Sequence, residues 1–198
     1  MGENPKYVFK TGSPTIDEIT REKITSKIEL EKKFSLKFSG SDILLLQHPV
    51  TTEITKSKEQ IEITLKALIQ TENNILAIAP NSDPGNNAIF KTLKKYTKEN
   101  KSIMYFENVP RSDFLGFLNN CFILIGNSSS GIVEATLFKI NVINLGVRQK
   151  GRERERAIID IEKPTEKKIL LEIIKCVNQK GTRKKSKIYG NGNASKKI

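Results

Sequence analysis

Residues 122–152 read FILIGNSSSGIVEATLFKINVINLGVRQKGR, and this stretch decides the fold. Phe122–Ile125 is a short apolar run bounded by turn residues, which predicts a buried strand. The polar and glycine residues of Gly126–Gly131 predict a tight turn, and Ile132–Phe138 predicts a short helix. A small polar loop is therefore expected at the carboxyl end of a strand, directly before a helix.

Three hydroxyl side chains in this turn, those of Ser128, Ser129 and Ser130, are expected beside unpaired backbone N–H groups at the helix N-terminus. This combination predicts a phosphate-binding turn. Glu134 falls about one turn into the helix, where its carboxylate can accept hydrogen bonds from a diol such as a ribose. The same residues are also typical of an ordinary helix start, in which a serine caps the helix and Glu134 complements the dipole.

The alternation of strand and helix patterns continues along the chain. Short apolar runs predict strands at Tyr7–Phe9, Ile43–Gln47, Ile75–Ala79, Ser102–Phe106, Phe122–Ile125, Val142–Asn144 and Ile158–Ile161. Apolar residues at helical spacing predict helices at Lys58–Thr71, Asn87–Tyr96 and Thr165–Val177. Because strands that alternate with helices form parallel sheets, the chain is predicted to be an α/β protein with a doubly wound, Rossmann-like parallel sheet.

Polar residues directly follow five of the predicted strands. They are His48, Asn81–Asp83, Glu107–Asn108, Asn127–Ser130 and Gly146–Arg152. Open α/β sheets bind ligands along the edge formed by the carboxyl ends of their strands. The sequence therefore predicts one ligand-binding crevice at this edge.

Two kinds of side chain at this edge could carry binding chemistry. His48 is the only histidine, and it lies in the tripeptide QHP beside a loop that proline stiffens. It is a candidate ligand contact, although a lone histidine is as often a polar cap on a strand end. Arg148 and Arg152 suit phosphate or carboxylate groups. The charged run 152–156 could equally form an ion-pair ladder on the surface.

Six blocks of sequence resemble the hydrolysing UDP-N-acetylglucosamine 2-epimerases, which share the two-domain architecture of GT-B glycosyltransferases. In chain order they are VFKTGSPTID, LQHPVTTE, APNSDPG, GNSSSGIVEA, INLGVRQKGR and KIYGNGNA. The resemblance runs from about residue 3 to the last residue, and it is specific because all six blocks occur in the order of the family.

The resemblance implies that this chain corresponds to the C-terminal half of a GT-B-type fold. Residues 1–40 would be the interdomain linker and an entry segment with a lysine-rich helix. Residues 41–185 would form the UDP-binding Rossmann-like domain, and residues 186–198 would begin a shortened C-terminal helix that crosses back to the first domain.

The resemblance also assigns roles to individual residues. His48 would donate a hydrogen bond to the diphosphate rather than shuttle a proton, and Glu134 would bind the ribose. Ser128, Ser129, Arg148 and Arg152 complete the expected diphosphate contacts. Val109 and Phe114 lie in the loop that holds the uracil in the family, although they fit a core role as well.

The family reaction begins with anti elimination of UDP from the sugar and continues with addition of water to the glycal. The resemblance places the acidic residues for this chemistry in the N-terminal domain, so no catalytic residue is expected in this chain, which alone is expected to be inactive. The products would be UDP and a free 2-epimeric sugar of the N-acetylmannosamine type. The substrate would be UDP-N-acetylglucosamine or UDP-N,N′-diacetylbacillosamine, and no cofactor or metal is implied.

The net charge of +12 raises nucleic acid and membrane surfaces as partners. The lysines are spread along the chain without interleaved aromatic residues, so neither partner is expected. Cys121 and Cys176 lie in apolar patterns, which predicts buried free thiols. The chain carries no signal-peptide pattern or long apolar stretch, which predicts a cytoplasmic location.

The expected partners are a UDP-sugar and the N-terminal domain, which the same protein or a separately encoded half would supply. The sequence leaves open whether the chain also forms a homo-oligomer. Two alternatives remain. One is half of a GT-B glycosyltransferase that uses a UDP-sugar, and the other is a non-catalytic nucleotide-binding remnant of a split gene.

Overall fold

The computed structural model describes residues 2–178 and 185–198, and its strands form one six-stranded sheet. All neighbouring strands are parallel, in the order β3-β2-β1-β4-β5-β6. The strands are β1 (Ile43–Leu46), β2 (Ile75–Ile78), β3 (Ile103–Phe106), β4 (Ile123–Gly126), β5 (Asn141–Leu145) and β6 (Ile159–Ile161). The order reverses between β1 and β4, which confirms the predicted doubly wound parallel sheet.

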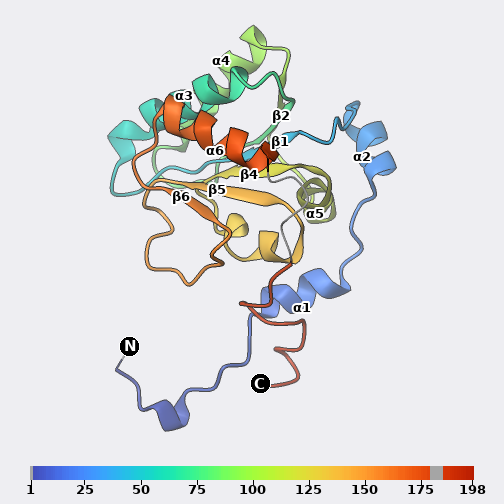
Figure 1. Ribbon diagram of the computed structural model, residues 1–198, viewed down its shortest axis with the longest axis vertical. Coiled ribbons are helices and arrows are strands. Elements are labelled where there is room, and N and C mark those ends of the chain that lie inside the picture. Colours follow the sequence, from blue (N-terminus) through green and yellow to red (C-terminus); the bar gives the residue numbers. More distant parts are fainter. Residues whose placement is uncertain (1, 179–184) are drawn as a thin grey trace.

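Helices cover both faces of the sheet (Figure 1). One face carries α3 (Ser57–Ile69), α4 (Asn86–Glu99) and α6 (Glu166–Asn178). The other carries α1 (Pro14–Arg21), α2 (Lys27–Phe34), α5 (Arg111–Asn120) and the short 3-10 helices η3 (Ser129–Gly131) and η4 (Glu134–Leu137). Two further 3-10 helices are η1 (Pro5–Tyr7) and η2 (Ile54–Lys56).

The strands supply both hydrophobic cores because successive side chains point to opposite faces of the sheet. In β1, Ile43 and Leu45 pack with α3, α4 and α6, whereas Leu44 and Leu46 pack toward α2 and α5. Cys121 and Cys176 are both buried, neither forms a disulfide, and they lie in different cores. The predicted buried thiols are thus confirmed.

The first forty residues differ from the prediction. Tyr7–Phe9 does not form a strand: Pro5–Tyr7 is the 3-10 helix η1, and Tyr7, Val8 and Phe9 are 72%, 60% and 78% exposed. A strand requires a paired neighbour, and no strand of the described residues lies against this run. Two short helices, α1 and α2, replace the single predicted lysine-rich helix.

Two expected helices also differ. The predicted helix Ile132–Phe138 is the single 3-10 turn η4, because Gly131 and the β-branched pair Ile132–Val133 disfavour a regular helix start. Residues 186–198 form turns and bends, with positive φ at two glycines, where the resemblance implied the start of a helix. Residues 179–184 lie outside the described residues.

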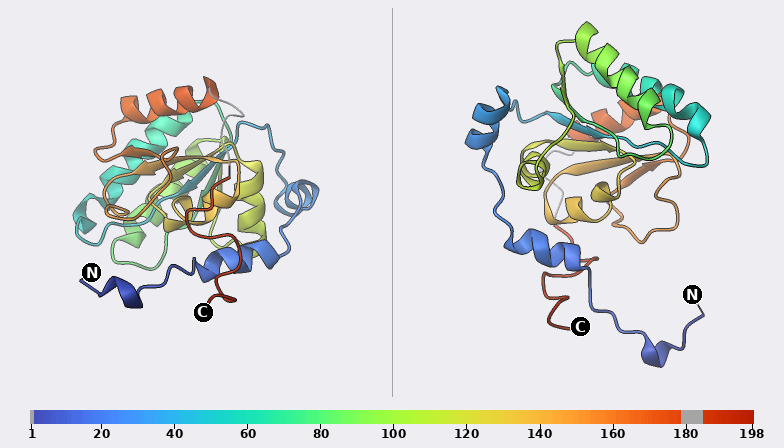
Figure 2. Two further views of the ribbon diagram at one scale, coloured as in Figure 1. Left: turned by 60° about the horizontal axis from the view of Figure 1, so that its bottom comes forward. Right: turned by 180° about the vertical axis from the view of Figure 1, so that it is seen from behind.

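The entering and leaving segments of the chain lie side by side (Figure 2). The Asp17 carboxylate in α1 accepts hydrogen bonds from the backbone N–H groups of Ala194 at 2.9 Å and Ser195 at 2.7 Å. The hydrogen bond from the Ser195 backbone, the largest contribution, lowers the pKa of Asp17. Helix α1 and the last residues therefore form one hydrogen-bonded unit.

A close backbone approach marks the point where the strand order reverses. Gly126 ends β4 with φ of +139°, and a Cβ atom there would lie 2.0 Å from the Leu46 carbonyl oxygen. Only glycine has no side chain to place in this space. The turn after β4 is therefore held directly against the end of β1.

Candidate functional site

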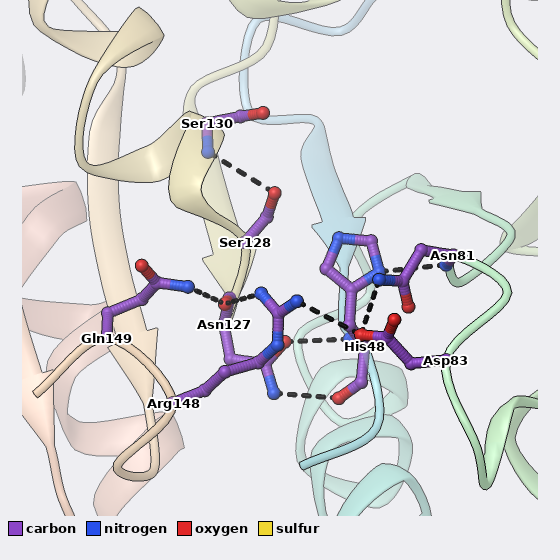
Figure 3. Close-up of polar contacts among 8 residues, drawn as sticks. All are labelled: His48, Asn81, Asp83, Asn127, Ser128, Ser130, Arg148 and Gln149. Atoms are coloured by element: carbon purple, nitrogen blue, oxygen red, sulfur yellow. Dashed lines mark hydrogen bonds and ion pairs between the residues drawn. The ribbon is translucent and has the colours of Figure 1, made fainter. Parts of the chain in front are cut away.

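The site begins with a hydrogen-bonded bridge between the ends of β1 and β4 (Figure 3). The Asn127 side chain accepts from the His48 backbone N–H at 2.7 Å and donates to the His48 carbonyl at 2.8 Å. Asn127 is almost fully buried, and its side-chain amide pairs with both backbone polar groups of His48. The bridge fixes the two loops on either side of the switch point.

The tautomer of His48 follows from its neighbours. Its Nδ1 atom accepts a hydrogen bond from the Asn81 backbone N–H at 3.0 Å, so the proton of the neutral ring is on Nε2. Burial, aided by the charge of Arg148, lowers the pKa of His48 from 6.5 to about 4. His48 is thus a neutral side chain at pH 7, with an N–H donor on the edge of the ring opposite Asn81.

Arg148 and Gln149 hold the loop after β5 to the same point. The Arg148 guanidinium donates to the Asn127 carbonyl at 3.3 Å and to Asp83 Oδ2 at 3.3 Å, and Gln149 Nε2 donates to the Asn127 carbonyl at 2.8 Å. Asp83 also accepts from Asn81 Nδ2, and this hydrogen bond is the largest cause of its lowered pKa. The ends of β1, β2, β4 and β5 therefore share one polar network.

Two cavities border Ser129 in the turn that follows β4. The first, of about 400 Å³, is lined by Val50, Thr51, Thr52, Asp83, Ser129, Val147, Arg148, Gln149 and Arg152. The second, of about 750 Å³, is lined by Ser13, Thr15, Glu18, Arg111, Ser129, Ser130, Val133, Glu134, Arg152 and Tyr189. We call them the switch-point cavity and the helix cavity. They share Ser129 and Arg152, so the two spaces meet at these side chains.

The hydroxyl groups of the turn Ser128–Ser130 differ in whether the protein itself uses them as hydrogen-bond partners. Ser128 is buried, and its Oγ atom accepts a hydrogen bond from the Ser130 backbone N–H at 3.3 Å, as a capping serine does. Ser129 lines both cavities, and its hydroxyl has no hydrogen-bond partner among the described residues. Ser129 is therefore free to contact a ligand in either cavity, whereas Ser130, whose hydroxyl also has no partner among the described residues, lines the helix cavity alone.

Glu134 lines the helix cavity with its side chain only 9% exposed. Its Oε1 atom accepts a hydrogen bond from Arg111 Nη1 at 2.6 Å, while Arg111 Nε lies 3.3 Å from the carboxylate of Glu22, the residue directly after α1. The charge of Glu134 is thus neutralised by a residue 23 positions earlier in the chain. Sequence reasoning placed Glu134 near a ligand but did not identify Arg111.

A family model for UDP-N-acetylglucosamine 2-epimerases matches residues 1–198. The chain belongs to this family. Among curated proteins it is 32% identical to the UDP-N,N′-diacetylbacillosamine 2-epimerase (hydrolyzing) of Legionella pneumophila, over 100% of this chain and 52% of that protein. It is 34% identical to the Campylobacter jejuni GDP/UDP-N,N′-diacetylbacillosamine 2-epimerase (hydrolyzing), over 82% of this chain and 43% of that protein. The chain therefore spans about half the length of these relatives.

Solved structures of the epimerase family share the fold. The Methanocaldococcus jannaschii UDP-GlcNAc 2-epimerase, crystallised with UDP-GlcNAc and UDP, superimposes with a TM-score of 0.75 at 18% identity. The match covers 100% of this chain and 55% of that chain. The sheet and its flanking helices are thus those of a GT-B-type epimerase, as the resemblance implied.

The structure places the other predicted site residues in two groups. Arg148 lines the switch-point cavity, and Arg152 lies where the cavities meet. His48 contacts the network but is not among the described residues that line either cavity. Val109 and Phe114 are also absent from both linings within the described residues; Val109 precedes α5, Phe114 lies within it, and both pack against the core on that face of the sheet. Their predicted contact with uracil remains a prediction.

Tyr189 is a further cavity residue that sequence reasoning missed, although it lies in the block KIYGNGNA. Within residues 2–178 and 185–198, no three His, Cys, Asp or Glu side chains gather as metal ligands would. No helix in the same described ranges has the length and apolar character to cross a membrane.

Proposed function

We propose that this chain forms the nucleotide-binding side of a hydrolysing UDP-sugar 2-epimerase. The substrate is UDP-N,N′-diacetylbacillosamine or UDP-N-acetylglucosamine, and the products are UDP and the free 2-epimeric sugar. Membership in the epimerase family supports the reaction class. Two hydrolysing relatives at 32% and 34% identity are named for the diacetamido substrate, which favours that sugar.

The observation that carries the proposal is the pairing of two chemically different cavities that meet at Ser129 and Arg152. The switch-point cavity offers the Arg148 guanidinium and the free Ser129 hydroxyl, which suit a diphosphate. The neutral N–H of His48 is a third donor beside it. The helix cavity offers the Glu134 carboxylate, which suits the hydroxyls of a ribose. A nucleoside diphosphate that passes Ser129 would place its diphosphate in the switch-point cavity and its ribose in the helix cavity.

The same arrangement limits what the chain does alone. Elimination of UDP needs a base at C2 of the sugar and an acid at the leaving group, and water must be excluded from the reacting centre. In our proposal these elements come from a second domain, which faces the strand ends across the crevice. The chain accordingly binds UDP weakly and does not turn over UDP-sugars by itself.

The binding site is tested with two single substitutions and two ligands. Ser129→Ala should weaken UDP binding and leave uridine binding nearly unchanged, because the proposal assigns the Ser129 hydroxyl to the diphosphate. Glu134→Gln should weaken both ligands by roughly tenfold to a hundredfold, since a charge-assisted hydrogen-bond pair is worth about 1.5–3 kcal/mol. Titration calorimetry measures each affinity, and melting temperatures measured in parallel identify unfolded variants. Unchanged UDP affinity in both folded variants would contradict the proposal that the two cavities bind a nucleoside diphosphate.

The reaction is tested by complementation. The N-terminal half of the Legionella pneumophila relative is mixed with this chain, and UDP release is followed with each candidate UDP-sugar. Release should require both halves and should fall with Glu134→Gln. UDP release by this chain alone, at a rate that Glu134→Gln does not change, would contradict the proposal that catalysis requires a second domain.

A further inference from the structure

The Glu134 carboxylate has two oxygens in different surroundings. Oε1 is held by Arg111 Nη1 at 2.6 Å. Oε2 has no donor among the described residues and is not one of their fully buried unpartnered atoms, while Glu134 itself lines the helix cavity. One oxygen is therefore occupied inside the protein, and the other is left for a group in the cavity.

Arg111 occupies an unusual place for a cation. It is the first residue of α5, where the aligned peptide dipoles favour negative charge. Its favourable interactions are with carboxylates, through Nη1 with Glu134 and through Nε with Glu22 at 3.3 Å. Helix stability does not explain an arginine at this position, but the need to hold a buried carboxylate does.

The guanidinium is planar, and its N–H groups point in fixed directions. Contacts through two different nitrogens to Glu134 and Glu22 fix its orientation, with α1 on one side and η4 on the other. A fixed guanidinium holds Oε1 in one place, and this limits rotation of the Glu134 carboxylate. Oε2 is then directed toward the cavity before any ligand arrives.

We propose that Arg111 is a positioning residue that makes the helix cavity select ribonucleotides over 2′-deoxyribonucleotides. Arg111 fixes the Glu134 carboxylate so that Oε2 accepts from ribose hydroxyls, and Arg111 itself does not contact the diphosphate. This inference rests on the proposed function, because it assigns the ligand of Glu134 to a ribose.

The test compares UDP with 2′-deoxy-UDP on the full chain, since the two ligands differ only in one hydroxyl. Calorimetry on the unmodified chain should give UDP an affinity about tenfold higher, the value of one hydrogen bond to a charged group. Arg111→Met should reduce this ratio to less than about threefold, because it should lower UDP affinity more than the affinity for 2′-deoxy-UDP, which keeps only the 3′ hydroxyl. Arg111→Lys keeps the charge but loses the planar fork, so its ratio should be intermediate.

A matched control is Arg21→Met, which removes an α1 arginine that contacts Ser195 and lines neither cavity. Its UDP to 2′-deoxy-UDP ratio should equal that of the unmodified chain. The double variant with Arg111→Met and Glu134→Gln should show no further loss of the ratio beyond Glu134→Gln alone, because both changes remove the same interaction. Additive losses of the ratio would contradict a shared role.

The outcomes separate the two proposals. Equal weakening of UDP and 2′-deoxy-UDP by Arg111→Met would overturn the positioning role and indicate contact with the diphosphate. A ratio lost in Glu134→Gln but kept in a folded Arg111→Met variant overturns the inference alone. If circular dichroism shows that Arg111→Met does not fold, the UDP to 2′-deoxy-UDP affinity ratio of Arg111→Lys is used for the same decision. Failure of the unmodified chain to bind UDP at millimolar concentration removes both proposals.

Discussion

The switch-point cavity and the helix cavity are built in different ways. The first is framed by loops that leave neighbouring parallel strands and are tied together at Asn127. The second is assembled from α1, α5, η4 and Tyr189 of the C-terminal segment, and two of its charged side chains, Arg111 and Glu134, pair with each other while Arg111 also pairs with Glu22. Strand register thus fixes the first cavity, whereas the packing of distant segments fixes the second.

The sharpest test of this difference is a substitution at the close approach of β4 to β1. Gly126→Ala should lower the free energy of unfolding by at least about 4 kcal/mol, because its Cβ would overlap the Leu46 carbonyl and its φ of +139° is unfavourable for alanine. Urea denaturation followed by circular dichroism measures the loss. UDP binding should disappear with it.

Gly146→Ala is the matched control for that substitution. Gly146 also has a positive φ, of +73°, but no atom lies within 4 Å of the position that an added Cβ would take. Only the backbone preference is lost, so the cost should be about 1–2 kcal/mol. Equal costs at the two glycines would mean that the close approach of β4 to β1 is not what holds the switch point.

A second, smaller effect concerns the pH dependence of stability. The pKa of His48 is about 4 in the folded chain and near 6.5 when unfolded. Between these values the unfolded chain binds a proton that folded His48 does not, so the free energy of unfolding decreases as pH falls from 7 to 4. The contribution is about 3 kcal/mol in total.

The measurement is urea denaturation at pH 7, 5.5 and 4.5 for the unmodified chain and for His48→Gln. Glutamine can still accept from the Asn81 N–H but does not titrate, so the variant should lose less stability over this range. Carboxylates titrate in both proteins and cancel in the comparison. Parallel curves for the two proteins would show that His48 is not the buried neutral group described here.

The two cavities also differ in how far the sequence predicts them. Short apolar runs predicted β1 to β6 within one or two residues, because the runs of β1 to β4 are apolar on both faces of the sheet and those of β5 and β6 keep apolar residues beside Asn144 and Asp160. The same reasoning failed at Tyr7–Phe9, where the apolar run has no neighbouring strand among the described residues. Periodicity cannot distinguish a short apolar run that pairs from one that does not.

Residues at strand ends could be placed together because parallel strands share a carboxyl edge, and the structure brings His48, Asn127 and Arg148 into one network. Arg111 could not be paired with Glu134 in the same way. That pair depends on how the start of α5 lies against η4, which the packing of the second core determines. Ion pairs between distant segments leave no local pattern in a sequence.

The smallest expected effect tests the uracil contact predicted for Phe114. Phe114, a residue of α5, is partly buried and packs against the core rather than lining either cavity within the described residues. Phe114→Leu should therefore lower the free energy of unfolding by about 1 kcal/mol through lost packing. UDP affinity, measured by calorimetry below the unfolding transition, should change by less than about twofold, since a change near 0.4 kcal/mol or less is expected for a residue outside the site. A tenfold loss of UDP affinity with unchanged stability would instead place the base against α5 and extend the helix cavity toward Phe114. It would also mean that packing of distant segments, and not strand register alone, determines which nucleotide the chain accepts.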